Sequence, residues 1–297
     1  MPSPVIFIDN PIEKDYSPLI EKVLTIVNGV DRLDIVIRQE ITNVTHLNEI
    51  LYYYYNLVRT AIDGLPLFDY TFSINIIFNI SHSKLLKLSS NWNHAFIAQQ
   101  EQTIFKNIPL VHSPIDIELT ASNYPSECKK RMKQFHTTAV GGTFDHLHDG
   151  HKILLSMAYF LTSKRLIIGI TGLELLKNKK FSEVLEPFHQ RQNSVVQFLD
   201  LIMDEIVHYE IYQINDICGP TGYIEAIDGL VISHETLSGG EFVNNYRREH
   251  GFKELDLTAI KVIGDAESNA ENKWKGKISS TDIRQRELER REKRSKN

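Results

Sequence analysis

The sequence predicts two α/β domains, each with a largely parallel sheet. Short β-prone runs alternate along the chain with longer segments of helical spacing, an order typical of parallel sheets. The polar, charge-rich segment 121–133 separates two such series and is interpreted as a linker. With 297 residues, 42% of them hydrophobic, the chain can form two cores. We therefore expect a smaller α/β domain over residues 1–130 and a second domain over residues 131–297.

The first domain is predicted from three strands and two helices. In chain order these are strand 5–8, helix 17–27, strand 33–37, helix 47–62 and strand 70–78. Its sequence contains no phosphate-binding loop, no metal-ligand spacing and no nucleophile context. The four consecutive tyrosines 52–55 point all round their helix, which favours a mixture of core and surface over a binding platform. The sequence therefore predicts no function for this half.

The second domain repeats the alternation more clearly. Its expected elements are strand 135–140, a helix from about residue 148, strand 165–171, a long helix carrying Val195 to Ile206, strands 209–214, 230–232 and 257–263, and a helix after Ser279-Ser280-Thr281. Gly141 and Gly142 are expected to turn the chain after the first of these strands. Such βαβ succession places ligands at the carboxyl ends of the strands, and each polar motif below follows a strand.

The segment 141–151 has the character of a phosphate site. His148 and His151 are three residues apart at the start of a helix, so they share one face and can meet one ligand. Backbone N–H groups and the positive dipole end also favour an anion there. A metal site would need further ligands that the pattern lacks, and simple helix capping is the remaining alternative. We interpret His146 as local structure.

Two further segments fit phosphate chemistry less specifically. Ser279-Ser280-Thr281-Asp282 supplies hydroxyls and N–H groups at another helix start, with Arg284 about one turn in. Alone this is a common capping pattern, but together with the first motif it predicts a second phosphate clamp. Lys177, Lys179 and Lys180 follow the second strand, where a cation could hold a second anionic substrate, although loop lysines are usually solvated.

Composition excludes several classes of protein. A net charge of −5 argues against a nucleic-acid partner, and the basic stretch 284–297 is interpreted as a solvated helix end. No uncharged apolar run approaches the ~20 residues that cross a bilayer, and the start does not resemble a signal peptide. Cys128 and Cys218 are expected to be reduced thiols. We expect a cytoplasmic protein without membrane contacts.

At these motifs the chain resembles a known family. Gly142-Thr143-Phe144-Asp145 with His148-Asp149-Gly150-His151 matches the HxGH signature of the nucleotidyltransferase superfamily, and segment 278–284 matches its ISSTxxR signature. The segments 174–180, 218–222 and 231–240 resemble the eukaryotic, fungal-type phosphopantetheine adenylyltransferases. The similarity covers about residues 134–290, and the first half weakly resembles the extension found in fungal members. It implies a Rossmann-like nucleotidyltransferase domain with a parallel sheet.

The resemblance also implies a reaction. AMP would pass from ATP to 4′-phosphopantetheine, giving dephospho-coenzyme A and pyrophosphate in coenzyme A biosynthesis, with Mg²⁺ accompanying ATP and no metal site on the protein. It assigns catalysis to His151, Thr143 and Lys179. It assigns ATP binding to Gly142, Thr143, Phe144, His148, His151, Ser279, Ser280, Thr281 and Arg284, and acceptor binding to Thr143, Lys177 and Lys179. Association with other enzymes of the pathway stays open.

One departure and two alternatives accompany this interpretation. Bacterial members carry an Arg-Gly-Leu-Arg segment that meets ATP, whereas the comparable strand end here is Ser233-His234-Glu235-Thr236. Arg247 and Arg248 are candidates for compensation, and what replaces the bacterial arginines stays open. A cytidylyltransferase acting on phosphocholine, phosphoethanolamine or glycerol phosphate shares the HxGH pieces, but it usually carries Arg-Thr-x-Gly-Ile-Ser-Thr-Thr, and segment 273–281 lacks that arrangement. The other alternative is a non-catalytic nucleotide-binding scaffold.

Overall fold

The computed structural model describes residues 3–27, 29–63, 65, 68–122, 134–263 and 279–295. The chain divides into two compact units, Met1–Met132 and Lys133–Asn297. Most of the expected linker 121–133, together with Cys128 and Ile278, lies outside the described residues. None of the helices in the described ranges is long and apolar enough to cross a membrane.

The first unit contains a five-stranded sheet in the order β4-β3-β1-β5-β6, with every neighbouring pair parallel. Its strands are β1 (Ser3–Ile8), β3 (Arg32–Ile37), β4 (Ser73–Ile77), β5 (Trp92–Ala98) and β6 (His112–Ile115). The remaining elements are α1 (Ser17–Ile26), α2 (Val44–Ile62), α3 (His82–Ser89), the short η1 (Gln99–Glu101) and α4 (Gln102–Phe105), and the antiparallel pair β2 (Lys14–Asp15) and β7 (Thr120–Ala121).

The five elements expected in the first unit are confirmed, but α3, β5 and β6 were not predicted. Exposed Asn93 and His94 interrupt the apolar pattern of β5. β6 contains Pro114 and lies at the sheet edge, where proline is tolerated but obscures the strand pattern. The prediction therefore missed the strands on one side of β1.

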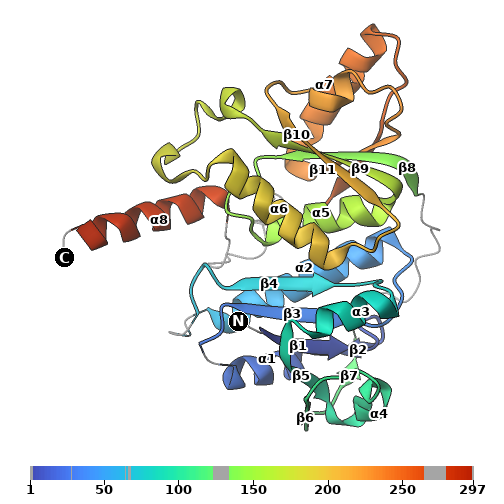
Figure 1. The fold of residues 1–297 in the computed structure, drawn as a ribbon, viewed down its shortest axis with the longest axis vertical. Coiled ribbons are helices and arrows are strands. Elements are labelled where there is room, and N and C mark those ends of the chain that lie inside the picture. Colours follow the sequence, from blue (N-terminus) through green and yellow to red (C-terminus); the bar gives the residue numbers. More distant parts are fainter. Residues whose placement is uncertain are drawn as a thin grey trace. The chain divides into compact units, whose positions relative to one another are not determined.

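The second unit has its own parallel sheet, in the order β10-β9-β8-β11-β12. Its strands are β8 (Phe135–Gly142), β9 (Thr162–Thr171), β10 (His208–Ile214), β11 (Gly229–Ser233) and β12 (Asp256–Ile260). Figure 1 shows α5 (Asp149–Leu161) and α6 (Phe188–Ile202) on one face and α7 (Leu237–Glu249) on the other. Leu166, Ile167 and Ile168 of β9 are almost fully buried, as expected for a strand covered on both faces.

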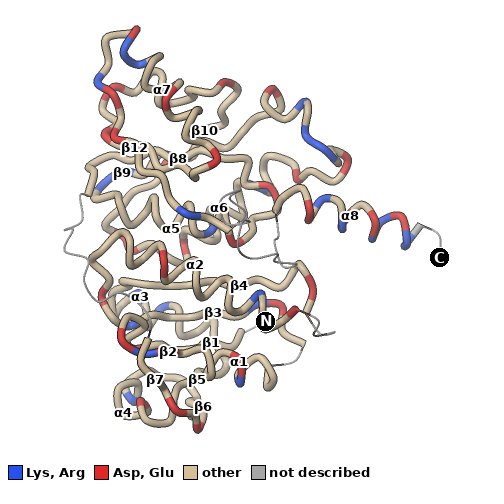
Figure 2. Tube along the Cα trace, turned by 180° about the vertical axis from the view of Figure 1, so that it is seen from behind, with Lys and Arg blue, Asp and Glu red and all other residues tan. Residues whose placement is uncertain are grey.

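Short 3₁₀ turns and the last helix complete the unit at the carboxyl ends of these strands. They are η2 (Leu173–Leu176), η3 (Ser182–Val184), η4 (Gly219–Gly222), η5 (His234–Thr236) and α8 (Ser280–Ser295). Figure 2 shows Lys and Arg interspersed with Asp and Glu along α8, and the side chains of Glu287 and Arg291 pair at 3.5 Å. Its outer turns are exposed, which agrees with the expected solvated helix end.

Two expectations for the second unit need correction, and one helix was not expected. Gly141 and Gly142 do not form the turn, because both belong to β8 and pair with Gly169 and Ile170 of β9. The long helix ends at Ile202, so Ile206 is not on its apolar face and is 79% exposed. Helix α7 was not predicted, since two consecutive glycines near its start and few apolar residues hide its pattern.

Candidate functional site

The two histidines of the first motif lie together at the start of α5. His148 occupies the N-cap position and His151 lies in the first turn. Their rings stack with centroids 3.8 Å apart and planes 22° apart, and the Phe144 ring lies 5.3 Å from that of His151. The helix start therefore presents both imidazoles as one group, as the three-residue spacing predicts.

Glycines allow the backbone to approach closely around these rings. A Cβ atom on Gly142 would lie 3.1 Å from the buried Phe144 ring, whereas Gly141 has space for one. A Cβ atom on Gly150 would lie 2.8 Å from the carbonyl oxygen of Ile263, which follows β12. A side chain at position 150 would thus require the backbone at Ile263 to move, whereas one at position 142 would require the Phe144 ring to shift by a few tenths of an ångström.

The environment of His151 keeps its imidazole neutral. Burial lowers the pKa of His151 well below its ordinary value, and the nearby charges of His148 and Lys179 lower that pKa further. Among the described residues, the buried Nδ1 atom of His151 has no hydrogen-bond partner. A neutral imidazole with an unused ring nitrogen suits hydrogen bonding to a ligand at this helix start.

The three candidate lysines have different surroundings. Lys177 pairs with Glu174 at 2.5 Å on an exposed surface. Lys180 provides a backbone carbonyl to which Arg284 Nε donates at 2.9 Å. Lys179 is exposed, and its charge acts on His151, so it belongs to the same electrostatic site. The electrostatic effect of Lys179 on His151, together with the pairing of Lys177 with Glu174, favours Lys179 over Lys177 as the candidate cation of this site.

The second motif reaches the first at the start of α8. Ser279 Oγ donates to Asp282 Oδ2 at 2.6 Å, and the Asp282 N–H donates back to Ser279 Oγ at 3.2 Å, which fixes the helix start. Ser280 Oγ donates to the backbone carbonyl of Asp145 at 3.0 Å. This bond joins two motifs 135 residues apart in the chain and places both at the carboxyl end of the sheet.

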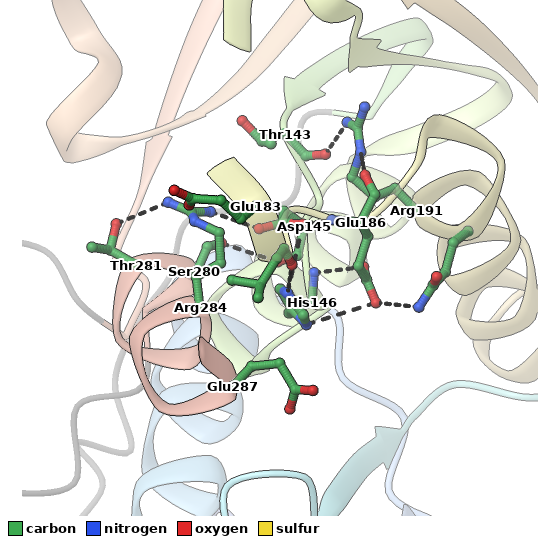
Figure 3. A network of polar contacts seen from close by, with 12 residues as sticks. Thr143, Asp145, His146, Glu183, Glu186, Arg191, Ser280, Thr281, Arg284 and Glu287 are labelled. Atoms are coloured by element: carbon green, nitrogen blue, oxygen red, sulfur yellow. Dashed lines mark hydrogen bonds and ion pairs between the residues drawn. The ribbon is translucent and has the colours of Figure 1, made fainter. Parts of the chain in front are cut away.

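The guanidinium of Arg284 bonds to protein groups through all three of its nitrogens. Its side chain is almost fully buried, with only 3% of its surface exposed, and Nη1 donates to Asp145 Oδ2 at 2.6 Å. Its Nη2 donates to Thr281 Oγ1 at 3.2 Å. The arginine expected to contact phosphate is thus in a buried ion pair with the loop that follows β8 (Figure 3).

Sequence analysis missed two residues that hold this loop, Glu186 and Arg191. The His146 N–H donates to Glu186 Oε2 at 2.7 Å, and the His146 ring lies 3.0 Å from the carbonyl oxygen of Val184, so His146 has the local structural role expected of it. Arg191 Nη1 donates to the Thr143 carbonyl at 2.7 Å. The available signal was an arginine on the apolar face of α6, four residues before buried Val195.

The structure does not support Arg247 or Arg248 as replacements for the bacterial arginines. Both lie in the last turn of α7, away from the end that follows β11. Arg247 is fully buried and donates to four backbone carbonyls, those of Thr221, Ile224, Glu225 and Lys253. Arg248 is exposed and pairs with Glu254 at 2.8 Å. Arg247 is therefore a structural residue, and that expectation is wrong.

Similarity to known proteins agrees with this geometry. The family model described as cytidylyltransferase-like matches residues 139–286. A phosphopantetheine adenylyltransferase from Saccharomyces cerevisiae is 39% identical over 259 residues, which cover 85% of this chain and 82% of the relative. The chain belongs to the phosphopantetheine adenylyltransferase family. The family resemblance and the nucleotidyltransferase fold predicted from the motifs are confirmed.

Other members of the family extend the comparison. A phosphopantetheine adenylyltransferase from Pyrococcus horikoshii is 38% identical over 153 residues, which cover 52% of this chain and 90% of the relative. An uncharacterized Schizosaccharomyces pombe protein is 33% identical over 69% of this chain and 68% of its own length. The similarity to the S. cerevisiae relative covers more of the chain than the second unit contains, so it includes part of the first unit.

Proposed function

We propose that this chain transfers the adenylyl group of ATP to 4′-phosphopantetheine and releases dephospho-coenzyme A and pyrophosphate. The observation that carries the proposal is the bond from Ser280 Oγ to the Asp145 carbonyl, because it brings the Ser-Ser-Thr helix start to the loop beside the two histidines. Two helix N-termini at one sheet edge suit a triphosphate. The S. cerevisiae and P. horikoshii relatives are named for this activity.

In the proposed reaction, a phosphate oxygen of 4′-phosphopantetheine attacks the α-phosphorus of ATP. A bond forms between them while the bond from the α-phosphorus to the bridging oxygen breaks, and pyrophosphate leaves. Such transfer depends on in-line positioning and on stabilising charge on the transferring group. The neutral imidazole of His151 would donate a hydrogen bond to an α-phosphate oxygen, and Thr143 would bond to both reacting phosphates.

The remaining candidates would divide between the two substrates. Gly142 and Phe144 would bring the backbone close to the nucleotide, His148 would lie beside the triphosphate, and Ser279 to Thr281 would bind its β- and γ-phosphates. Lys179 would hold the acceptor phosphate because it lies close enough to influence His151, whereas Lys177 already pairs with Glu174.

We propose that Mg²⁺ arrives with ATP. Nucleotidyltransferases that use ATP need a divalent metal ion in general, and Mg²⁺ is the proposed one. The described residues contain no cluster of three or more His, Cys, Asp or Glu side chains that could hold an ion. The Asp145 carboxylate is bonded to Arg284 and to the Glu186 N–H. Magnesium commonly keeps several waters and binds through substrate phosphates, and when bound it neutralises phosphate charge.

A matrix of nucleotides and acceptors tests the proposal. Pyrophosphate release is measured with ATP or CTP, each combined with 4′-phosphopantetheine, phosphocholine, phosphoethanolamine or glycerol phosphate. We expect release with ATP and 4′-phosphopantetheine. Release only with CTP would establish a cytidylyltransferase instead, and no release with any pair would support a nucleotide-binding scaffold. Mass spectrometry of the acceptor product identifies the group that was transferred.

A further inference from the structure

The loop that joins β8 to α5 has an unfavourable backbone conformation. Phe144 and His146 both have positive φ angles, 50° and 46°, in the left-handed region that bulky residues rarely adopt. Neither residue is a glycine, which would adopt this conformation easily, and Phe144 is completely buried. Such a conformation persists only where surrounding contacts determine it, and it is common where a loop must meet a ligand. The side chains that bond to this loop therefore determine its conformation.

Arg191 holds the beginning of the loop. It reaches from α6 with only 1% of its surface exposed. Nη1 donates to the Thr143 carbonyl at 2.7 Å, Nη2 to the Thr171 carbonyl at 2.9 Å, and Nε to the Glu186 carbonyl at 3.1 Å. One guanidinium thus ties the first residue after β8 to the last residue of β9. Burial lowers the pKa of Arg191, and nearby Asp145 and Glu186 oppose that effect.

Arg284 holds the middle of the loop from the other side. Its Nη1 donates to Asp145 Oδ2 at 2.6 Å, while the Glu186 N–H donates to Asp145 Oδ1 at 2.9 Å. Asp145 is completely buried, so both carboxylate oxygens depend on these partners. Nε of Arg284 also donates to the Lys180 carbonyl at 2.9 Å, which connects α8 to the lysine-bearing segment. Figure 3 shows Arg191 and Arg284 approaching the loop from two helices.

We propose that Arg191 and Arg284 are positioning residues, which set the conformation of loop 143–146 and do not bind ATP phosphate themselves. This inference rests on the proposed function. A phosphate-binding arginine needs a guanidinium edge open to the ligand, but Arg191 is only 1% and Arg284 only 2% exposed. Each nitrogen of these two side chains also donates one N–H to a protein oxygen. Arg191 acts through the Thr143 carbonyl, and Arg284 acts through Asp145.

A double-mutant cycle separates this role of Arg284 from direct phosphate binding. Asp145→Asn, Arg284→Gln and the double variant are compared in ATP affinity by calorimetry and in kcat. We expect the single variants to lose similar factors, of at least ~10-fold, and the double variant to be no worse than either one, because breaking the buried pair once removes its effect. The double variant replaces the buried ion pair with two neutral side chains that can hydrogen-bond, and its thermal unfolding is measured as a control for the fold.

Direct contact with ATP gives a different pattern and would overturn the proposal. Arg284→Gln alone would weaken ATP binding, Asp145→Asn would not, and the double variant would show the product of the two effects. ATP affinity does not depend on which acceptor the enzyme uses. If the wild type binds ATP but does not release pyrophosphate with 4′-phosphopantetheine, the proposed function fails while the cycle still decides the role of Arg284.

Arg191 has a matched control in Arg247, another buried arginine that donates to backbone carbonyls, but one outside the loop. Arg191→Lys and Arg247→Lys both lose the forked guanidinium, so both should lower Tm. We expect only Arg191→Lys to lower kcat, by ~10- to ~10²-fold, with a much smaller change in KM for ATP. The kcat values are measured at a temperature below the Tm of both variants. Equal kcat values in Arg191→Lys and Arg247→Lys would show that Arg191 has only a structural role and would overturn the proposal. If Arg191→Lys does not fold, Arg191→Gln takes its place in the comparison.

Discussion

The two units of this chain share one strand order but differ at the loop that follows the central strand. Counted along each unit and leaving out the small β2–β7 pair, both sheets read 3-2-1-4-5. In the first unit, the hydroxyl oxygen of Tyr16 accepts the N–H groups of Asp9 and Asn10, the two residues after β1, at 3.2 and 3.0 Å. Tyr16 also donates to Glu101 at 2.8 Å, and Lys14 pairs with the same carboxylate.

The corresponding loop of the second unit is held from outside. Arg191 holds its first carbonyl, Glu186 holds the His146 N–H, and Arg284 holds Asp145. In the first unit, the N–H groups that follow β1 are thus bonded to the Tyr16 hydroxyl. In the second unit, the loop after β8 leads to a helix start that carries His148 and His151. Strand order alone therefore does not make a nucleotide site, and the contacts of one loop make the difference.

The largest expected effect tests whether the chemistry belongs to the second unit alone. His151→Ala should lower kcat by at least ~10²-fold, the scale seen when one transition-state hydrogen bond is removed. Tyr16→Phe is the control in the first unit: losing its buried hydrogen bonds should cost about 1–3 kcal/mol of stability. It should leave kcat close to wild type. A large loss of kcat in Tyr16→Phe, with normal turnover in His151→Ala, would reverse the comparison.

The next effect concerns the lysines after β9. Lys179→Ala should raise KM for 4′-phosphopantetheine by ~10-fold or more, because a charge-assisted hydrogen bond contributes about 1.5–3 kcal/mol. Lys177→Ala loses only an exposed pair with Glu174, which contributes about 0–1 kcal/mol. Initial rates at varied acceptor concentration measure both. The reverse order of effects would transfer the acceptor role to Lys177.

Two adjacent glycines give a smaller effect, on stability. Gly142→Ala places a Cβ atom 3.1 Å from the Phe144 ring and should cost about 1–3 kcal/mol in unfolding free energy. Gly141→Ala meets nothing closer than 3.8 Å and should change that free energy by about 0.5 kcal/mol or less. Denaturant unfolding of both variants provides the measurement. Equal costs at both positions would mean that Phe144 does not pack against this strand end as described.

The smallest effect is a dependence of stability on pH. The pKa of His151 is lowered in the folded protein, so below about pH 6.5 the unfolded chain binds a proton that the folded chain excludes. Stability contributed by the neutral ring is present above that pH and is lost as pH falls, by up to ~1.4 kcal/mol per unit. His151→Asn should flatten the decline in Tm between neutral and mildly acidic pH. An unchanged decline would show that His151 is not the responsible group.

The sequence predicted the site mainly through motifs that follow strands. A β-prone run, helix-start histidines and the Ser-Ser-Thr cap are local patterns, so β8, α5 and the start of α8 could be anticipated, whereas the turn expected at Gly141 and Gly142 is part of β8. The roles of Arg191 and Arg284 could not, since their partners are 48 and 139 residues away in the chain. The family resemblance already favoured Lys179 over Lys177, but the neighbours that distinguish them, Glu174 beside Lys177 and His151 within the electrostatic reach of Lys179, do not follow from two lysines in one short turn.

The most direct test of the account follows the α-phosphorus of ATP. The enzyme is incubated with 4′-phosphopantetheine and ATP labelled at its α-phosphorus, and in parallel with ATP labelled at its γ-phosphorus. We predict that the α label appears in dephospho-coenzyme A and the γ label in pyrophosphate, and that His151→Ala slows both while Tyr16→Phe slows neither. Transfer of the γ label to the acceptor, or retention of both labels in ATP, would contradict adenylyl transfer by the second unit.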